Sequence, residues 1–340
     1  MTLATPWDWM MWCALLTGGL SSGAVFTSPP SPMLAQLDAR LPRGERWAYE
    51  PKLDGFRGLL WRRDGATQLL SRSGRDLGPW FPELITAAES LPCNTVVDGE
   101  IVIADERGQA DFGALQQRLT LARKFIGQAV ASKPAILLVF DVLALDGEEL
   151  TTFPLSDRRR ALEQLLAHGH RCLQVVSQSL DVHVAEAWLG VPGLEGVVAK
   201  RVDRPYVAGR GRDWVKVKRQ RTIECVVVGV TGDLSAPRLV LGLRHDDGRL
   251  HHFAVSRPIS AEDGGPLATL LAEAGPTEAA IKSRWQHDAV PPWRRVEAKI
   301  VCEVRVTNLD LGRWARFPVA FVRWRPDRSP DDCALDQLSV

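Results

Sequence analysis

The sequence lacks the short motifs that most often mark a metal centre or a nucleotide-binding loop. Its six cysteines lie far apart and form no C-x-x-C pair, which argues against a zinc ribbon and fits a protein of the reducing cytoplasm. Neither a Walker A loop nor a G-x-G-x-x-G sequence is present, so the two usual glycine-rich loops cannot account for phosphate binding. Any phosphate chemistry must therefore depend on other residues.

An excess of positive charge is also absent. The 340 residues carry a formal net charge of +1, so a surface for nucleic acid can only be a local patch. Only eight of the 42 Lys and Arg residues are lysine. Because arginine does not lose its proton in proteins, it cannot replace lysine as a nucleophile. The few lysines are therefore the first candidates for covalent chemistry.

The amino-terminal residues 1–27 are largely apolar, yet they contain no Lys or Arg. A secretory signal peptide starts with a basic region, and Gly18, Gly19 and Gly23 would interrupt a membrane span. We interpret residues 1–27 as a leader that is disordered or wrongly assigned to the chain, and we expect no membrane association. The length and the 45% hydrophobic content predict two globular domains after it.

Residues 28–221 alternate between strand and helix patterns. Short apolar or alternating runs bounded by turn residues predict strands at 56–62, 67–71, 95–103, 135–145, 172–177, 194–201 and 213–218. Helical periodicity indicates helices at 81–90, 111–121 and 156–168, the last of them beginning at an N-cap Ser156. These patterns predict an α+β domain of antiparallel sheets with flanking helices.

Residues 222–330 are richer in strands, and a tail of residues 331–340 follows them. Strands are expected at 223–230, 238–243, 250–255, 296–308 and 319–324, with one helix between 260 and 274. Five strands and one helix over about 110 residues are typical of a small closed β-barrel. The basic link from Lys218 to Arg221 joins the two domains and is a candidate hinge.

Lys52 lies in the stretch YEPKLDGFR, residues 49–57. It follows a short expected strand and precedes a tight turn at Asp54-Gly55, so its amine can point into a cleft. A free lysine is neutral in only roughly one copy in 2,500 at pH 7. A nucleophilic lysine therefore needs neighbouring cations, which favour the neutral amine and neutralise phosphates. Taken alone, a surface lysine beside a β-turn is the commoner explanation of such a pattern.

Other stretches carry residues suited to nucleotide chemistry, each with an ordinary structural alternative. Arg72 and Arg75 surround a glycine turn and can hold phosphate, although a charged β-turn is the commoner reason for this pattern. Asp98 and Glu100 interrupt an apolar strand, which is costly unless the carboxylates meet cations, hydroxyls or a metal, or lie at an exposed edge. Phe140 follows a buried run, where it can stack on a base or pack in the core.

The remaining stretches lie nearer the carboxyl terminus. Glu195 precedes an apolar strand that ends in a lysine; it can hold a divalent cation or belong to a solvated pair at the strand ends. Lys216 and Lys218 share one face of a strand, so their repulsion requires an anion between or above them. This is the strongest physical signal for phosphate. Arg323 and Arg325 alternate with apolar residues and present a basic edge, or an ordinary surface patch.

In this order, these elements resemble the covalent nucleotidyltransferase superfamily of ATP-dependent DNA ligases and mRNA capping enzymes. The resemblance is strongest to the short bacterial ligases of actinobacterial repair pathways, and it covers roughly residues 28–330. It implies an adenylation domain followed by an OB-fold domain. It also implies a monomeric DNA repair enzyme that seals nicks in duplex DNA, with ATP as substrate and Mg²⁺ or Mn²⁺ as the metal.

The resemblance implies a role for each matching residue. Lys52 is similar to the catalytic nucleophile that forms lysyl-AMP. Glu100 and Glu195 resemble metal-associated acids, and Arg72 and Arg75 resemble DNA contacts. Arg316 and Asp327 resemble members of the last ligase motif, in which Arg328 replaces the usual lysine. The implied nucleotide-binding positions are Glu50, Arg57, Arg72, Glu100, Phe140, Arg210, Lys216, Lys218, Arg323 and Arg325.

Other classes remain open. An RNA ligase or a GTP-dependent capping enzyme shares the lysine motif, although the stretches 71–76 and 316–327 argue against both. A non-catalytic OB-type nucleic-acid-binding protein would not need Lys52. A NAD-dependent ligase also shares the lysine motif, but it normally adds zinc cysteines and further domains, which this sequence lacks.

Overall fold

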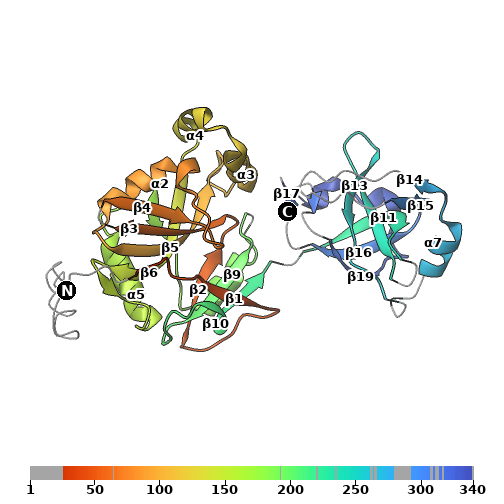
Figure 1. The fold of residues 1–340 in the computed structure, drawn as a ribbon. Coiled ribbons are helices and arrows are strands. Elements are labelled where there is room, and N and C mark those ends of the chain that lie inside the picture. The colour runs from red at the N-terminus through yellow and green to blue at the C-terminus, as the bar shows by residue number, and fades with distance from the viewer. Residues whose placement is uncertain are drawn as a thin grey trace. The chain divides into compact units, whose positions relative to one another are not determined.

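The computed structural model describes residues 26–338, apart from 64, 192, 220, 234–235, 261–262, 264–265, 279–291, 307–308, 311–313 and 316–317. The chain divides into two compact units, Met1–Lys218 and Arg219–Val340 (Figure 1). Residues 1–25 of the expected leader lie outside the described part. Within the described residues, no helix is long and apolar enough to cross a membrane.

The first unit contains two sheets, of which the larger has six strands. Their order is β4-β3-β5-β6-β7, with β8 beside β6, and every pair is antiparallel except β6 with β8. The strands predicted at 95–103 and 135–145 are confirmed, because both are mainly apolar runs flanked by turn residues. The bounds are β3 Phe56–Arg63, β4 Ala66–Leu70, β5 Thr95–Ile103, β6 Ala135–Leu145, β7 Glu148–Glu149 and β8 Leu173–Val175.

The smaller sheet has four strands in the order β1-β10-β9-β2. Strand β1 is parallel to β10, and the other two pairs are antiparallel. The register sets Gly196, the first residue of β9, between Lys52 of β2 and Lys218 of β10. The ends of β2, β9 and β10 therefore bring Lys52 and Lys218 close together. The bounds are β1 Met33–Asp38, β2 Trp47–Lys52, β9 Gly196–Arg201 and β10 Gly209–Lys218.

The two faces of the larger sheet pack against different layers, as the period of two along a strand requires. Leu60 of β3 belongs to a core shared with the helices α2, α3 and α5. Its neighbours Leu59 and Trp61 pack with Met33 and Trp214 of the smaller sheet. Helix α6 covers the other face of the smaller sheet. The helix bounds are α2 Pro82–Ala87, α3 Phe112–Thr120, α4 Ile126–Ser132, α5 Leu155–Leu165 and α6 Val182–Trp188.

The predicted N-cap at Ser156 is wrong. Helix α5 begins one residue earlier, after Pro154, and has no side-chain cap. The free N–H groups of its first turn are satisfied by another segment, because Leu155 and Ser156 donate to the carbonyl oxygens of Arg204 and Val202, each at 3.0 Å. Tertiary backbone contacts thus replace the serine hydroxyl at this helix end.

The second unit is a region of antiparallel strand pairs, and its described residues include one α-helix, α7. Seven strands pair in the order β13-β12-β11-β15-β14, with β16 beside β11 and β19 beside β16. The single strand expected at 296–308 is instead β16 alone, preceded by the short β15. The strand ladders of the described residues leave the sheet open, so the closed barrel stays a prediction. The bounds are β11 Arg221–Thr231, β12 Arg238–Arg244, β13 Leu250–Val255, α7 Leu267–Glu273, β14 Thr277–Glu278, β15 Trp293–Arg295, β16 Val301–Val306, β17 Leu309–Asp310, β18 Trp314–Ala315 and β19 Ala320–Trp324.

Candidate active site

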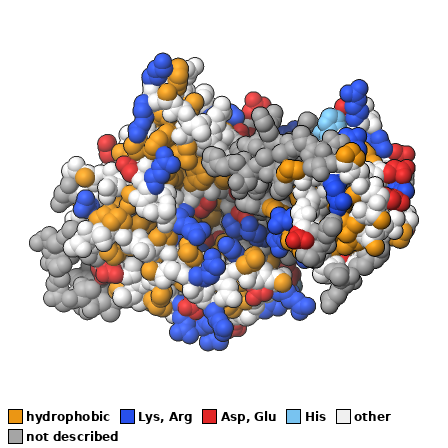
Figure 2. Space-filling model, turned by 45° about the vertical axis from the view of Figure 1, so that its right-hand side comes forward, with side chains coloured by type: hydrophobic (Ala, Val, Ile, Leu, Met, Phe, Trp, Pro, Cys, Tyr) orange, Lys and Arg blue, Asp and Glu red, His pale blue; other side chains and the backbone are white. Residues whose placement is uncertain are grey.

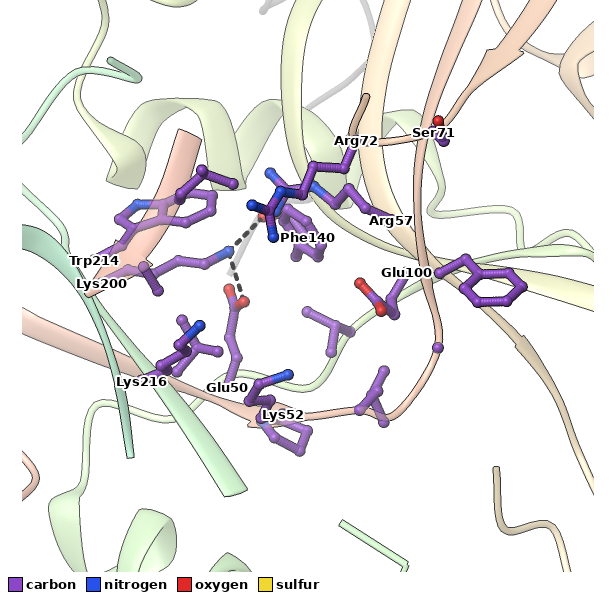
Figure 3. A pocket seen from close by; sticks show the side chains of 18 of the residues that line it. Glu50, Lys52, Arg57, Ser71, Arg72, Glu100, Phe140, Lys200, Trp214 and Lys216 are labelled. Atoms are coloured by element: carbon purple, nitrogen blue, oxygen red, sulfur yellow. Dashed lines mark hydrogen bonds and ion pairs between the residues drawn. The ribbon is translucent and has the colours of Figure 1, made fainter. Parts of the chain in front are cut away.

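A cavity of about 730 Å³ is lined by residues from both sheets of the first unit. Lys and Arg side chains gather around a hollow on the visible face of this unit (Figure 2). Inside the cavity, lysines of the smaller sheet and a glutamate of the larger sheet point into one space (Figure 3). The sequence-predicted residues that line it are Glu50, Lys52, Arg57, Arg72, Arg75, Glu100, Phe140, Arg210 and Lys216.

Lys52 is the last residue of β2, so the strand is longer than the sequence suggested and ends on the lysine itself. Its carbonyl oxygen accepts a hydrogen bond from the N–H of Glu195 at 2.9 Å. Its Nζ atom donates to Oε2 of Glu195 at 2.5 Å. The amine is thus held by a partner that lies 143 residues away in the chain.

Glu195 pairs with two lysines at once, since its Oε1 atom lies 2.5 Å from Nζ of Lys218. The close approach of β9 and β10 depends on Gly196, because a Cβ there would lie 2.1 Å from the carbonyl oxygen of Val217. Burial alone would raise the pKa of Glu195, but the ammonium groups of Lys52 and Lys218 lower it to about 2. Glu195 is therefore the anion that offsets the repulsion among these lysines.

Lys216 lines the cavity on the same face of β10 as Lys218. Burial lowers the pKa of Lys216, and the charges of Lys52 and Lys218 lower it further. The carboxylate of Glu195 opposes this effect. Three ammonium groups around one carboxylate leave a surplus of positive charge, which suits a bound phosphate.

Arg57 is held by a buried carboxylate on the neighbouring strand. Its Nε and Nη2 atoms donate to the two oxygens of Asp98, each at 2.5 Å. The hydroxyl of Tyr206 donates to Asp98 at 2.6 Å and accepts from the N–H of Met33 at 2.8 Å. The Asp98 side chain is fully buried. The acidic residue of 96–102 that meets Arg57 is thus Asp98, and its role is to fix the guanidinium.

Glu100 lines the cavity on the same face of β5 as Asp98, and its carboxylate forms no hydrogen bond or ion pair with the residues that the structure describes. Burial raises the pKa of Glu100 to about 7, although the charges of Lys52 and Arg57 oppose the shift. A carboxylate that is costly to ionise and has no fixed partner is suited to bind a cation or a sugar hydroxyl.

The family of the chain follows from a comparison of its sequence with family models and with known proteins. Residues 32–218 match the family model described as ATP dependent DNA ligase domain, which is more than half of the chain. The chain is 37% identical to DNA ligase C1 of Mycolicibacterium smegmatis over 334 residues, covering 92% of this chain and 94% of that protein. 

This chain belongs to the ATP-dependent DNA ligase family.

Two further similarities extend over nearly the whole ligase. DNA ligase C of Mycobacterium tuberculosis is 33% identical over 343 residues, which cover 91% of this chain and 94% of that protein. The solved structure of mycobacterial DNA ligase D complexed with ATP and MES is similar with a TM-score of 0.51 and 30% identity, over 89% of this chain and 97% of that chain. The expected family is therefore confirmed.

The role of Lys200 in this ligase was not predicted from the sequence. This lysine is buried, and its Nζ atom lies 2.6 Å from Oε2 of Glu50. The same atom lies 4.2 Å from the ring centre of Phe140 and 4.3 Å from that of Trp214 (Figure 3). A period of two along β9 places Lys200 on the face of Val198, and both residues line the cavity. That alternation was the available signal.

Glu50 has a buried side chain whose oxygens are shared between partners inside the ligase. Besides Lys200, it accepts a hydrogen bond from Nε2 of Gln178 at 2.9 Å. Burial lowers the pKa of Lys200, and the charge of Glu50 opposes this. The ring of Phe140 also meets the guanidinium of Arg57, with 4.6 Å from Cζ to the ring centre. A base that stacks on Phe140 must share this ring with two cations.

The other sequence-predicted residues of the ligase are distributed between the two units. Arg72, Arg75 and Arg210 line the cavity. Arg323 and Arg325 belong to the second unit, where Arg323 donates to Glu303 at 2.7 Å and Arg325 pairs with Asp327 at 2.7 Å. Arg316 lies outside the described residues.

The raised pKa of Glu100 gives a test of this site in the ligase without substrate. Its carboxyl group binds a proton more tightly in the folded state than the ordinary value of 4.5 allows. The resulting stabilisation is complete below about pH 4.5 and is lost as the pH rises through about 7. The glutamine of Glu100→Gln stays neutral at every pH. The unfolding free energy of this variant relative to the parent should therefore rise between pH 5 and pH 8, by up to about 3 kcal/mol. The difference between the two melting temperatures should increase accordingly. Equal differences at both pH values would contradict the assignment.

Proposed function

We propose that this ligase transfers AMP from ATP to Lys52, passes it to the 5′-phosphate at a nick in duplex DNA, and then joins the strands. In the first step the neutral amine attacks the α-phosphorus, a bond between Nζ and phosphorus forms, and the bond to pyrophosphate breaks. AMP then moves to the 5′-phosphate, and the 3′-hydroxyl displaces it. The reaction leaves a phosphodiester, AMP and free Lys52.

The observation that carries this proposal is the position of the Lys52 amine. It points into the cavity and lies against Glu195, which also holds Lys218. Glu195 fixes where the nitrogen lies, and Lys216 lines the cavity beside it. Cations fixed before the reaction stabilise the charge that develops on the phosphates without reorganisation. Arg72 and Arg210, from other segments of the cavity wall, are further candidates for phosphate contacts.

We assign the opposite part of the cavity to the nucleoside. Phe140 and Trp214 offer aromatic surface, and Lys200 lies over both rings. Glu50 is the proposed adenine position, through its backbone and its buried carboxylate. Arg57 and Glu100 are the proposed ribose partners, because Asp98 holds the guanidinium in a fixed direction and Glu100 has a carboxylate available.

A divalent cation, Mg²⁺ or Mn²⁺, fits this cavity through Glu100. Its carboxylate has no other partner among the described residues, and hard cations prefer such oxygen ligands. Glu195 can bind the cation only if it breaks its ion pair with Lys52 or Lys218, since each of its two oxygens pairs with one of these lysines. Within the described residues, no group of three or more His, Cys, Asp or Glu side chains is arranged to hold a metal. Phosphate oxygens and water would therefore complete the ligand set, and the cation would neutralise phosphate charge.

We propose that the second unit is an OB-fold. Its strands β11, β12, β13, β16 and β19 follow the order of such a barrel, with α7 between the third and fourth of them. An isolated parallel bridge joins Ser256, after β13, to Val319, before β19. Val319 donates to Val255 at 3.0 Å and accepts from Arg257 at 2.7 Å. This bridge lies where the two edges of the sheet would close.

The proposed function predicts a distinct pattern of substrates. ATP radiolabelled at its α-phosphate should leave its label on the protein in a denaturing gel, whereas GTP labelled at the same phosphate should not. In a separate sealing assay, nicked duplex DNA should be joined in preference to nicked RNA. Because every described residue of the cavity wall belongs to the first unit, one copy of the chain should suffice. Labelling by GTP would favour a capping-type enzyme, and DNA binding without any labelling would favour a non-catalytic binding protein.

A further inference from the structure

Two arginines from distant segments lie over one tryptophan ring beside the cavity. The Cζ atom of Arg75 is 4.7 Å from the ring centre of Trp80, and that of Arg123 is 4.5 Å from the same centre. The two guanidinium groups therefore lie no more than about 9 Å apart. Such contacts between cation and ring restrict long side chains that would otherwise move freely.

The backbone around this stack is ordered by local hydrogen bonds. Arg75 lies in the turn after β4, where the N–H of Ser71 donates to its carbonyl oxygen at 2.8 Å and its own N–H donates to Oγ of Ser71 at 3.0 Å. Trp80 ends the short 3₁₀ helix Gly78–Trp80. Arg123 begins the 3₁₀ helix Arg123–Phe125, between α3 and α4. The arginines are thus anchored by both backbone and ring.

Four exposed cations form what we call the outer basic stripe: Arg72, Arg75, Arg123 and Lys124. Within the described part of the chain, none of the four forms an ion pair. The cations inside the cavity differ, since Lys52, Arg57 and Lys200 each have a carboxylate partner. Exposed like charges held close together create a local positive potential that favours an anionic partner.

The stripe is continuous with the cavity. Arg72 and Arg75 line the cavity wall, and so does Leu119 of α3, four residues before Arg123. The region of α3 and α4 forms the top of the first unit in Figure 1, and the corresponding part of Figure 2 carries Lys and Arg side chains. A strand whose end enters the cavity would therefore leave it along a positively charged surface.

We propose that the stripe binds the sugar–phosphate backbone of the duplex on one side of the nick, with Arg123 and Lys124 as contacts outside the catalytic cavity. Successive phosphates of one strand advance about 3.4 Å along the helix axis, so cations within about 9 Å can meet neighbouring phosphates of the same strand. The contacts read no base, so they add affinity and salt dependence but no sequence preference. This inference rests on the proposed nick-sealing function.

The test compares Arg123→Ala/Lys124→Ala with the parent in the full chain. Binding to a nicked duplex at about 150 mM salt should weaken by roughly ten-fold, and the slope of log affinity against log salt should become shallower by about 1 to 2. Shortening the duplex on one side of the nick should remove the difference between parent and variant, whereas shortening the other side should not. Labelling by ATP should be unchanged, because neither residue lines the cavity.

Arg160→Ala is the control, since it removes one exposed charge from α5 and should alter neither binding nor salt dependence. Unchanged nick affinity and salt slope in the double variant, with normal labelling, would overturn the stripe and leave the proposed function intact. Absence of ATP labelling in the parent protein would instead overturn the proposed function itself. The two failures are therefore distinguishable.

Discussion

Lys52→Ala should lose ATP-dependent labelling and nick sealing by at least about 10³-fold, because no other group can take the place of a covalent nucleophile. Lys52→Arg is the sharper variant. It keeps a positive charge opposite Glu195, so the packing and electrostatics of the ion pair are retained, but a guanidinium does not supply a neutral nitrogen. Both variants should therefore fail in the first chemical step, which labelling with radioactive ATP measures directly.

The final sealing step can be measured separately from the transfer of AMP to Lys52 in the same variants. A nick that already carries AMP on its 5′-phosphate does not need the lysyl intermediate, so Lys52→Arg should seal it with much of the parent activity. Lys133→Ala, which removes an exposed lysine paired with Asp111, is the matched control and should label normally. Labelling of Lys52→Arg at the parent rate would mean that another residue is the nucleophile.

Asp98→Ala should have the largest effect on stability. The carboxylate is fully buried and accepts two hydrogen bonds from Arg57 and one from Tyr206. Its removal leaves the largely buried Arg57 guanidinium without its carboxylate, and breaking a buried pair in this way costs about 3–5 kcal/mol of unfolding free energy. The loss should appear as a lower midpoint in urea unfolding followed by circular dichroism.

The same variant should also weaken ATP binding, because Arg57 would no longer be held against Asp98. Asp203→Ala is the control, since Asp203 pairs with Arg201 at the surface and its loss should change the unfolding midpoint little. Asp98→Asn keeps the shape of the side chain and isolates the charge. An unfolding midpoint of Asp98→Ala equal to that of the parent would show that the pair does not stabilise the first unit.

The strands of this ligase were predicted best where mainly apolar runs are bounded by turn residues. Both β5 and β6 lie inside the larger sheet, and most of their residues are buried, although Asp98 and Glu100 interrupt the apolar run of β5. The start of α5 was predicted one residue late because its first N–H groups bond to the carbonyl groups of Arg204 and Val202, which lie 49 and 46 residues further along the chain. Contacts of that range leave no local pattern.

Many of the residues that line the cavity were predicted from the sequence, but the ion pairs between them were not. Lys52, Lys216 and Glu100 do line one space, as the order of the motifs suggested. Their partners depend on strand register, because Glu195 reaches Lys52 and Lys218 only when β9 lies between β2 and β10. That register follows from packing of the whole sheet, so no single motif contains it.

The burial of Lys200 could not be predicted from the sequence either, because it depends on residues from other strands. A lysine at the end of an apolar strand is ordinarily exposed, and the sequence left a solvated pair at the strand ends as an open alternative. Its burial is possible only because Glu50 supplies a carboxylate at 2.6 Å and two aromatic rings cover the ammonium group. All three partners come from other strands, and their convergence is a property of the fold.

The most direct test is to locate the AMP. The protein is incubated with ATP and Mg²⁺, digested, and its peptides are analysed by mass spectrometry under conditions that preserve a phosphoramidate. The expected result is a single AMP on the peptide that contains Lys52, which disappears when nicked DNA is added. AMP on a different residue, such as Lys216, or an adduct that nicked DNA does not discharge, would contradict the assignment of Lys52.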